Sequence, residues 1–285
     1  MRLSDHYPQQ RAFVTGAASG FGLALCKALA REGWTLGLAD VNEQGLDEAA
    51  AHLTALGGRP LSFVLDVSDI DAFQRTAASF IEQAGGVDVV INNAGIGSGG
   101  LLEETSLDDW NATISINLMG VVHGCLAFVP HLKRAGSGHL INVASIAAVA
   151  AGPYMAAYNT AKAGVLGLTE TLYSECKEAG VRVSVVLPSF FKTNIATTSR
   201  GNEAARKMTE ILIRRAEHSA DEVAAYTLTE AGKGTLHIIY PRFAKRIWHW
   251  KRLLPMHYLN SMVKSARRTA GFVARVDQEA AKTDA

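Results

Sequence analysis

The chain has 285 residues, 48% of them hydrophobic and 19% charged, with a formal net charge of +1. This composition excludes a disordered chain, and the length suits one large α/β domain. The N-terminus lacks the apolar run of a signal peptide, and we expect no membrane-spanning helix. Cys26, Cys125 and Cys176 form no Cys-x-x-Cys pair. We therefore expect buried, reduced thiols in a cytoplasmic protein, and no metal site.

Short apolar runs alternate with longer amphipathic stretches between residues 11 and 240. The runs predict strands at 11–15, 34–39, 61–65, 87–91, 139–143, 182–187 and 236–240. The amphipathic stretches predict helices near 21–32, 43–56, 69–84, 107–134, 154–179 and 220–231. Strands that alternate with helices predict a parallel sheet covered on both faces. Residues 97–100 and 193–202 have the composition of loops.

The first predicted strand leads into a glycine-rich turn at residues 15–22. Gly16, Gly20 and Gly22 would let backbone N–H groups approach a pyrophosphate, which the following helix N-terminus stabilises. The spacing is GxxxGxG, and its place after a strand favours a dinucleotide site over an ordinary tight turn.

Asp40 closes the second predicted strand. A carboxylate there can accept hydrogen bonds from adenosine-ribose hydroxyls and would repel a 2′-phosphate. The glycine turn holds no Lys or Arg, and Ser19 precedes Gly20. We therefore expect NAD as the cofactor. The alternative is that Asp40 caps the N-terminus of the next helix.

Tyr158 and Lys162 stand four residues apart in a predicted helix, with Ser145 thirteen residues upstream. Residues at this spacing share one helix face, so the phenol lies beside a positive charge. A nearby ammonium lowers the pKa of a phenol, ordinarily about 10, and the phenol can then exchange a proton with an alcohol or carbonyl. The alternative is an ordinary helix with a buried Tyr and a solvated Lys.

Together with further motifs, these residues resemble the classical short-chain dehydrogenase/reductase family over about residues 10–240. The further motifs are Asp66-Val67, Asn92-Asn93-Ala94-Gly95 and Asn117 in Ile-Asn-Leu-Met-Gly. The resemblance implies a Rossmann-type sheet of seven strands in the order 3-2-1-4-5-6-7, with the active site beyond their carboxyl ends. It also implies a homodimer or homotetramer, with the 107–134 and 154–179 helices in the interface.

The resemblance also implies roles for single residues. Tyr158 would be the general acid/base, Ser145 would hold the substrate oxygen, and Lys162 would bind the nicotinamide ribose and lower the tyrosine pKa. Asn117 would hold a water that links Lys162 to solvent. The implied cofactor contacts are Gly16, Ser19, Gly20, Phe21, Gly22, Asp40, Val41, Asp66, Val67, Asn92, Asn93, Ala94, Gly95, Tyr158, Lys162, Pro188, Phe191 and Thr193. The family usually has Pro-Gly where this chain has Pro188-Ser189, which removes some backbone freedom.

Substrate pockets of the family follow the catalytic serine, the Asn-Asn-Ala-Gly motif and the proline after the sixth strand. The corresponding residues are Ile96, Gly97, Ile146, Ala147, Ala148, Phe190 and the loop to about His218, with Pro153, Tyr154 and Met155 as further candidates. The apolar character of this set predicts a hydrophobic secondary alcohol and its ketone or aldehyde. Lys192 and Arg200 could meet an acid, although a solvated loop suits both better. The alternative to an enzyme is a catalytically silent cofactor-binding or membrane-associated interaction protein, which the intact Ser-Tyr-Lys set disfavours.

Residues 241–285 follow the 1–240 catalytic domain as a basic extension. Residues 1–230 carry 17 Lys and Arg against 24 Asp and Glu, whereas ten Lys and Arg and no acid lie between Glu230 and Asp277. In residues 242–254, apolar side chains recur at helical spacing at Phe243, Ile247, Trp250 and Leu254. Pro255 should end that helix, and a second periodic stretch covers 259–272.

Three interpretations of the extension compete. It could pack as a lid on its own domain or on a neighbouring subunit, because large apolar residues usually find a protein surface. It could lie on an anionic membrane as a basic amphipathic helix. Nucleic-acid binding is the third interpretation, and we expect none because no recognised module accompanies the charge.

Overall fold

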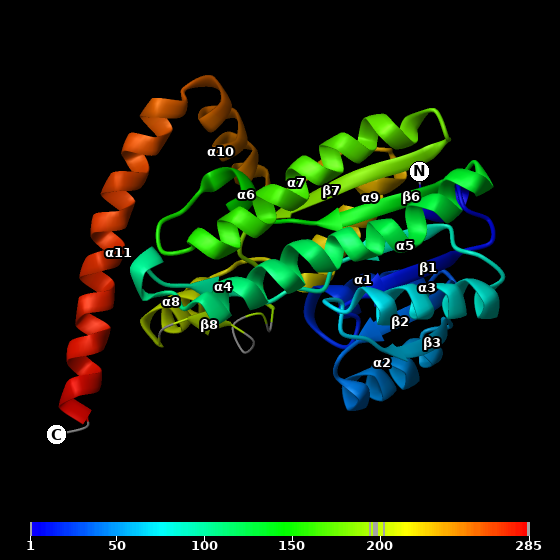
Figure 1. The fold of residues 1–285 in the computed structure, drawn as a ribbon, viewed down its shortest axis with the longest axis horizontal. Coiled ribbons are helices and arrows are strands. Elements are labelled where there is room, and N and C mark those ends of the chain that lie inside the picture. The colour runs from blue at the N-terminus through cyan, green and yellow to red at the C-terminus, as the bar shows by residue number, and fades with distance from the viewer. Residues whose placement is uncertain (1, 194, 196–198, 202, 284–285) are drawn as a thin grey trace.

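The computed structural model describes residues 2–193, 195, 199–201 and 203–283. Its centre is a seven-stranded parallel sheet in the order β3-β2-β1-β4-β6-β7-β9 (Figure 1). The strands are β1 (Arg11–Thr15), β2 (Thr35–Asp40), β3 (Arg59–Val64), β4 (Val89–Asn92), β6 (Gly138–Val143), β7 (Val181–Pro188) and β9 (His237–Tyr240). Leaving out two very short strands, this is the predicted order 3-2-1-4-5-6-7.

Helices cover both faces of the sheet. They are α1 (Gly20–Ala30), α2 (Glu43–Ala55), α3 (Ile70–Ala84), α4 (Leu107–Ile114), α5 (Gly120–Ala135), α6 (Ala147–Ala150), α7 (Ala156–Lys177), α8 (Glu203–Arg214), α9 (Ala220–Gly232), α10 (Arg242–Leu253) and α11 (Pro255–Thr283). Alternate residues of a strand face opposite sides. Phe13 of β1 therefore joins the core under α3, α5, α7 and α10, and Ala12 and Val14 join the core under α1, α2 and α9. All three cysteines are buried, as predicted.

Side-chain caps fix the start of several helices. Asn42 accepts a hydrogen bond from the Gly45 N–H at 3.1 Å at the start of α2, and Asp69 accepts one from Ala72 at 2.9 Å at the start of α3. The cap of α2 is thus Asn42 rather than Asp40, which removes the alternative role considered for Asp40.

Two segments with loop composition pair with each other. β5 (Ser98–Gly99) lies parallel to β8 (Arg200–Gly201), so the chain after β4 is joined to the chain after β7. The prediction of plain loops at 97–100 and 193–202 was therefore incomplete; residues 194, 196–198 and 202 of the second loop lie outside the described residues. Helix α8 follows immediately and was not predicted.

The predicted helix 107–134 is a run of α4, a π-helical segment η3 (Ser115–Met119) and α5. Among the described residues, this Leu107–Ala135 run alone is long and apolar enough to span a membrane, which the sequence reading had not anticipated. Half of its most apolar stretch is buried inside the protein. Length and apolar composition alone are weak evidence for a membrane-spanning helix, because the core helix of a globular domain has the same properties.

The C-terminal extension forms two helices at one side of the domain (Figure 1). α10 ends at Leu253, and Pro255 opens α11, where a proline at the first helical position is well tolerated. α10 packs through Ala244 and Trp248, which are buried. Of the four apolar residues that recur at helical spacing, Ile247 is half-buried against the core, whereas Phe243, Trp250 and Leu254 are exposed.

Candidate active site

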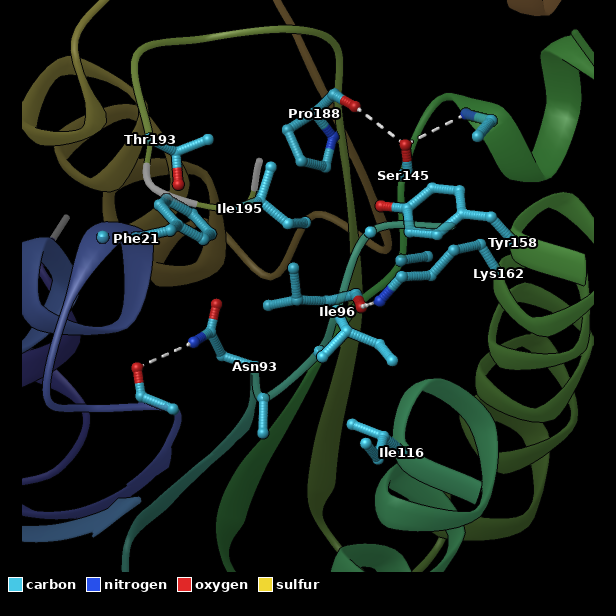
Figure 2. A pocket seen from close by; sticks show the side chains of 18 of the residues that line it. Phe21, Asn93, Ile96, Ile116, Ser145, Tyr158, Lys162, Pro188, Thr193 and Ile195 are labelled. Carbon is cyan, nitrogen blue, oxygen red and sulfur yellow. Dashed lines mark hydrogen bonds between the residues drawn. The ribbon is translucent and has the colours of Figure 1, made fainter. Parts of the chain in front are cut away.

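A cleft of about 430 Å³ lies at the carboxyl ends of β1, β4, β6 and β7. Figure 2 shows side chains of its two walls. One wall is the glycine-rich turn with the chain after β4, and the other is formed by α6, α7 and the chain after β7. The location is the one predicted for an open α/β sheet.

The glycine-rich turn forms a surface that side chains would fill. A Cβ on Gly22 would lie 2.0 Å from the Gly16 carbonyl oxygen and 2.6 Å from Asn93 Nδ2. Gly16 has a φ of +67°, a conformation that L side chains rarely adopt. Asn93 donates a hydrogen bond to the Thr15 carbonyl at 2.9 Å, and the Asn93 N–H donates to Thr15 Oγ1 at 2.9 Å. The turn after β1 is thus locked to the chain after β4.

Asp40 lines the same wall, beside Val41. Its Oδ2 accepts a hydrogen bond from the Ala18 N–H at 3.1 Å, and its Oδ1 accepts one from the Asn42 N–H at 3.1 Å. The carboxylate is held in place and still lines the cleft. Lys162 is the sole Lys or Arg among the described lining residues, and it belongs to the opposite wall.

Most of the predicted cofactor contacts line this cleft. They are Gly16, Ser19, Gly20, Phe21, Asp40, Val41, Asp66, Val67, Asn93, Ala94, Gly95, Tyr158, Lys162, Pro188, Phe191 and Thr193. Gly22 lies behind the turn, where it provides space rather than contact. Asn92 points away, because its Nδ2 donates to Asn142 Oδ1 at 2.9 Å inside the sheet. The glycine cradle and the fixed acid at its end fit an adenine dinucleotide.

Ser145, Tyr158 and Lys162 converge on the opposite wall. Ser145 follows β6, and the other two stand on one face of α7 (Figure 2). The Tyr158 phenol points toward the Ser145 hydroxyl, which accepts a hydrogen bond from the Ala147 N–H at 3.1 Å. Lys162 Nζ donates to the Val143 carbonyl at 3.0 Å and lies 5.8 Å from the centroid of the Tyr158 ring. The predicted shared face is therefore present.

Burial dominates the electrostatics of this pair. It raises the pKa of Tyr158 to about 12, although the hydrogen bond with Ser145 opposes the rise. It lowers the pKa of Lys162 to about 8. Both changes favour the uncharged forms of the two side chains. The Tyr158 phenol therefore keeps its proton at neutral pH. The expected lowering of the tyrosine pKa by Lys162 is not found, because burial dominates and the pKa of Tyr158 is raised.

Asn117 lies in the π-helical segment η3, and its side chain is fully buried. Its Oδ1 accepts a hydrogen bond from the Ile96 N–H at 2.8 Å, and its Nδ2 donates to the Ile96 carbonyl at 2.9 Å. A Cβ on Gly95 would lie 2.9 Å from Asn117 Oδ1 and 3.5 Å from Lys162 Nζ. Both groups therefore lie close to Gly95, which leaves no room for a side chain there. π-Helical turns often occur at functional sites.

The loop after β7 crosses from the catalytic wall to the glycine turn. Phe191 packs its ring against Phe21 at a centroid distance of 5.4 Å, and a Cβ on Gly20 would lie 3.1 Å from Thr193 Oγ1. Ser189, where the family usually has glycine, donates its N–H to the Tyr240 carbonyl at 2.8 Å.

The substrate side of the cleft is mainly apolar. Of the residues considered from sequence, Ile96, Gly97, Ile146, Ala147, Met155 and Phe190 line it, whereas Ala148, Pro153, Tyr154, Lys192 and Arg200 do not. Arg200 instead pairs with Asp109 at 3.2 Å. Sequence reasoning missed Ile116 and Ala150, while the predicted stretch from Phe190 to about His218 also contributes Ile195, Ser199, Thr209 and Ile213. The last two belong to α8, and the spacing of Met208, Ile211 and Leu212 could have revealed that helix.

The family model and two relatives that match this chain are all described as dehydrogenases or oxidoreductases. A protein-family model described as short chain dehydrogenase matches residues 10–204. EphD of Mycobacterium tuberculosis, described as a probable oxidoreductase, is 38% identical over 187 residues, which cover 65% of this chain and 32% of EphD. The chain thus spans about a third of that relative. SadH of the same organism, another protein named as an oxidoreductase, is 34% identical over 252 residues, which cover 87% of this chain and 91% of SadH.

Two solved structures with the same fold contain different nicotinamide cofactors. A short-chain dehydrogenase/reductase from Burkholderia phymatum in complex with NAD has a TM-score of 0.81 at 33% identity, covering 86% of this chain and 95% of its own. An alcohol dehydrogenase from Thermococcus sibiricus complexed with 5-hydroxy-NADP has a TM-score of 0.71 at 27% identity, covering 81% and 95%.

Proposed function

Because the chain belongs to the short-chain dehydrogenase/reductase family, we propose that it interconverts a hydrophobic secondary alcohol and its carbonyl compound with NAD. The observation that carries the proposal is the convergence of Ser145, Tyr158 and Lys162 on one wall of an apolar cleft. The glycine turn and Asp40 form the opposite wall. A proton-transfer group and a dinucleotide cradle thus share one cavity.

Tyr158 carries the proton in this proposal. In the reducing direction its protonated phenol donates to the carbonyl oxygen, and in the oxidising direction the phenolate takes the hydroxyl proton. Ser145 holds the substrate oxygen beside the phenol by a hydrogen bond and stabilises the charge that develops there. The pKa of Tyr158, raised by burial to about 12, supports a proton donor at neutral pH.

Lys162 and Asn117 return the proton to solvent. A lysine whose pKa is lowered to about 8 gains and loses a proton readily near neutral pH. The nearness of Lys162 Nζ and Asn117 Oδ1 to Gly95 supports a water that bridges them, because a buried water needs several polar partners. Asn117 acts by holding this route in place and by fixing the backbone of Ile96.

The nicotinamide, when bound, supplies the hydride acceptor or donor. The chain would hold the cofactor through the glycine turn and through the loop after β7. Asp40 favours NAD, since its carboxylate can accept from ribose hydroxyls and repels a 2′-phosphate. No described Lys or Arg lies on that wall to offset the repulsion.

The apolar lining supports a hydrophobic substrate. Ile96, Ile146, Met155, Ile195 and Ile213 offer no charge to a polar substrate beyond the catalytic groups. Pockets of this kind fix a ligand by apolar burial and by a few polar groups at one end.

The proposal is tested with NAD and a panel of aliphatic, aromatic and steroid alcohols. Wild-type protein should form NADH with hydrophobic members, and Tyr158→Phe should lower kcat by about 100-fold to 10,000-fold while NAD binding persists. Tyr154→Phe is a matched control, because Tyr154 does not line the cleft. Equal inactivity of wild type and Tyr158→Phe across the panel would support the second candidate, a cofactor-binding protein without catalysis. A strong preference for small charged substrates would contradict the assigned substrate class.

We also propose that the chain forms a homodimer or homotetramer through α4, α5 and α7. Leu107, Met119 and Leu126 are large apolar side chains exposed along the α4–α5 run, which supports a subunit contact there. Light scattering after size exclusion measures the mass. A monomer at micromolar concentration would contradict this part of the proposal.

A further inference from the structure

The two C-terminal helices expose more large apolar side chains than any comparable segment of the described chain. The set consists of Phe243, Trp250, Leu253, Leu254, Met256, Leu259 and Val263. Leu253 is 76% exposed and Met256 is 64% exposed, at the turn between α10 and α11. Single exposed apolar residues are ordinary, but a contiguous group marks an interaction site.

α11 divides its surface into three rows. Tyr258 is buried, and half-buried residues continue its row along the side that faces the domain: Ser261, Met262, Ser265 and Ala266. Tyr258 anchors this row by donating its hydroxyl to the Ala150 carbonyl at 2.8 Å. The two other rows are exposed. One is apolar, with Met256, Leu259 and Val263, and the next is basic, with Lys264, Arg267 and Arg268.

α10 continues the same division. Ala244, Ile247 and Trp248 face the domain, and Arg252 stacks over the Trp248 ring at 3.7 Å. The exposed positions include Arg242, Lys245, Arg246 and His249. The sequence has no acid between Glu230 and Asp277, so no carboxylate within these helices offsets the charge of this surface up to residue 276. Outside these helices, Glu170 of α7 pairs with Arg252 at 3.5 Å. The other basic groups and the exposed apolar row suit an occupant that is both apolar and anionic.

We propose that the α10–α11 hairpin, residues 242–268, binds the surface of an anionic phospholipid bilayer. Leu253, Leu254 and Met256 enter the headgroup layer, and the Lys and Arg residues beside them meet lipid phosphates. The turn lies at the edge of the molecule, away from the sheet (Figure 1). A projecting turn suits a soft interface, whereas a protein partner would need a groove shaped to receive it.

Vesicle co-sedimentation of the full chain tests the proposal. Wild-type protein should sediment with phosphatidylcholine vesicles that contain about 30% phosphatidylserine, and much less with phosphatidylcholine alone. Salt at about 0.5 M should weaken the binding, because it screens the lipid charge. Leu253→Ser/Leu254→Ser and, separately, Lys264→Gln/Arg267→Gln should each weaken binding on the order of tenfold.

Matched pairs elsewhere on the surface control for loss of apolar groups and of charge. Val64→Ser/Leu102→Ser removes two exposed apolar side chains outside the proposed subunit contact, and Arg31→Gln/Arg75→Gln removes two exposed arginines. Both should bind vesicles like wild type. Absence of wild-type binding would overturn the proposal, as would equal losses in the control pairs. A change in oligomer mass in the two hairpin variants, with unchanged vesicle binding, would assign the surface to a second copy of the chain instead. The readout does not depend on catalysis.

Discussion

The two walls of the cleft are held in different ways. The wall formed by the glycine-rich turn and the chain after β4, called the cofactor wall from here on, is fixed mainly by backbone contacts. These are the close approach of Gly22 to Gly16, the hydrogen bonds between Thr15 and Asn93, and the N–H groups that hold Asp40. The wall formed by α6, α7 and the chain after β7, called the substrate wall from here on, depends on side chains from distant segments. Ile195 and, from α8, Ile213 line it, and Tyr258 of α11 donates a hydrogen bond to the Ala150 carbonyl. The first wall therefore leaves no room for a side chain at Gly16 or Gly22, whereas the second depends on how side chains from separate segments pack together.

The largest effect is expected at Lys162, on the wall that carries Ser145 and Tyr158. Lys162→Met removes the charge beside Tyr158, and kcat should fall by about 100-fold or more. Burial lowers the lysine pKa from 10.5 to about 8. Between these values the unfolded chain binds more protons, so the free energy of unfolding of wild type should rise with pH relative to the variant.

Denaturant unfolding of both proteins across that pH window measures this difference. The expected gain for wild type is at most about 3 kcal/mol. If the free energy of unfolding depends on pH in the same way in wild type and in Lys162→Met, burial does not lower the pKa of Lys162 and the prediction is wrong.

Gly22→Ala tests the rigidity of the cofactor wall. The added Cβ meets the Gly16 carbonyl oxygen and Asn93, and neither can move without breaking the lock between β1 and β4. We expect a loss of about 1–3 kcal/mol in stability. NAD affinity, followed by titration, should fall on the order of tenfold to 100-fold. The control is Gly167→Ala in α7, where nothing lies within 4 Å of the new Cβ. Equal behaviour of the two variants would contradict the rigid wall.

Asp40→Asn sharpens the cofactor choice. Removing one negative charge near the ribose should raise the ratio of NADP to NAD efficiency by about tenfold, the effect of a charge pair at the protein surface. Asp66→Asn is the matched control, because Asp66 also lines the cleft but holds the Ser68 N–H and hydroxyl at 2.9 and 2.7 Å. Steady-state kinetics with both cofactors measures the ratio. An equal change in both variants would remove the special role of Asp40.

Tyr258→Phe should have the smallest effect on activity, and we expect that effect at the substrate wall. It removes the hydrogen bond to the Ala150 carbonyl, worth about 1 kcal/mol. KM for the alcohol should rise about fivefold with kcat nearly unchanged. Tyr173→Phe, whose hydroxyl accepts from Lys177 outside the cleft, is the control. A fall in kcat without a change in KM would place the effect at the catalytic groups instead.

Most of the sheet and the cofactor wall could be predicted from sequence. Strand and helix periods are local, and the glycine turn, Asp40 and the Tyr158–Lys162 pair depend on short spacings. The pairing of β5 with β8 could not be predicted, because two residues carry no period and their partners lie a hundred positions apart. Asn92 was misjudged for a related reason: its neighbour Asn142 belongs to another strand.

The packing face of α10 shows where periodicity alone is insufficient. Apolar residues recur at helical spacing on two faces, one with Phe243, Ile247, Trp250 and Leu254 and one with Ala244 and Trp248. Of the first face, Ile247 alone is half-buried against the core. The second face packs, because the Trp248 ring meets His237 at 4.7 Å and the Arg252 guanidinium covers it. Both partners depend on the tertiary fold, which the local pattern does not contain.

The short β5–β8 pairing has a consequence for engineering this cleft. Because Ser98 and Gly99 are bonded in register with Arg200 and Gly201, the loops after β4 and β7 form one mechanical unit. A Cβ on Gly201 would lie 1.7 Å from the Gly99 carbonyl oxygen, so the join tolerates no side chain there. Loop grafts that aim to change substrate range should exchange both segments together, and randomised libraries should leave Gly201 untouched.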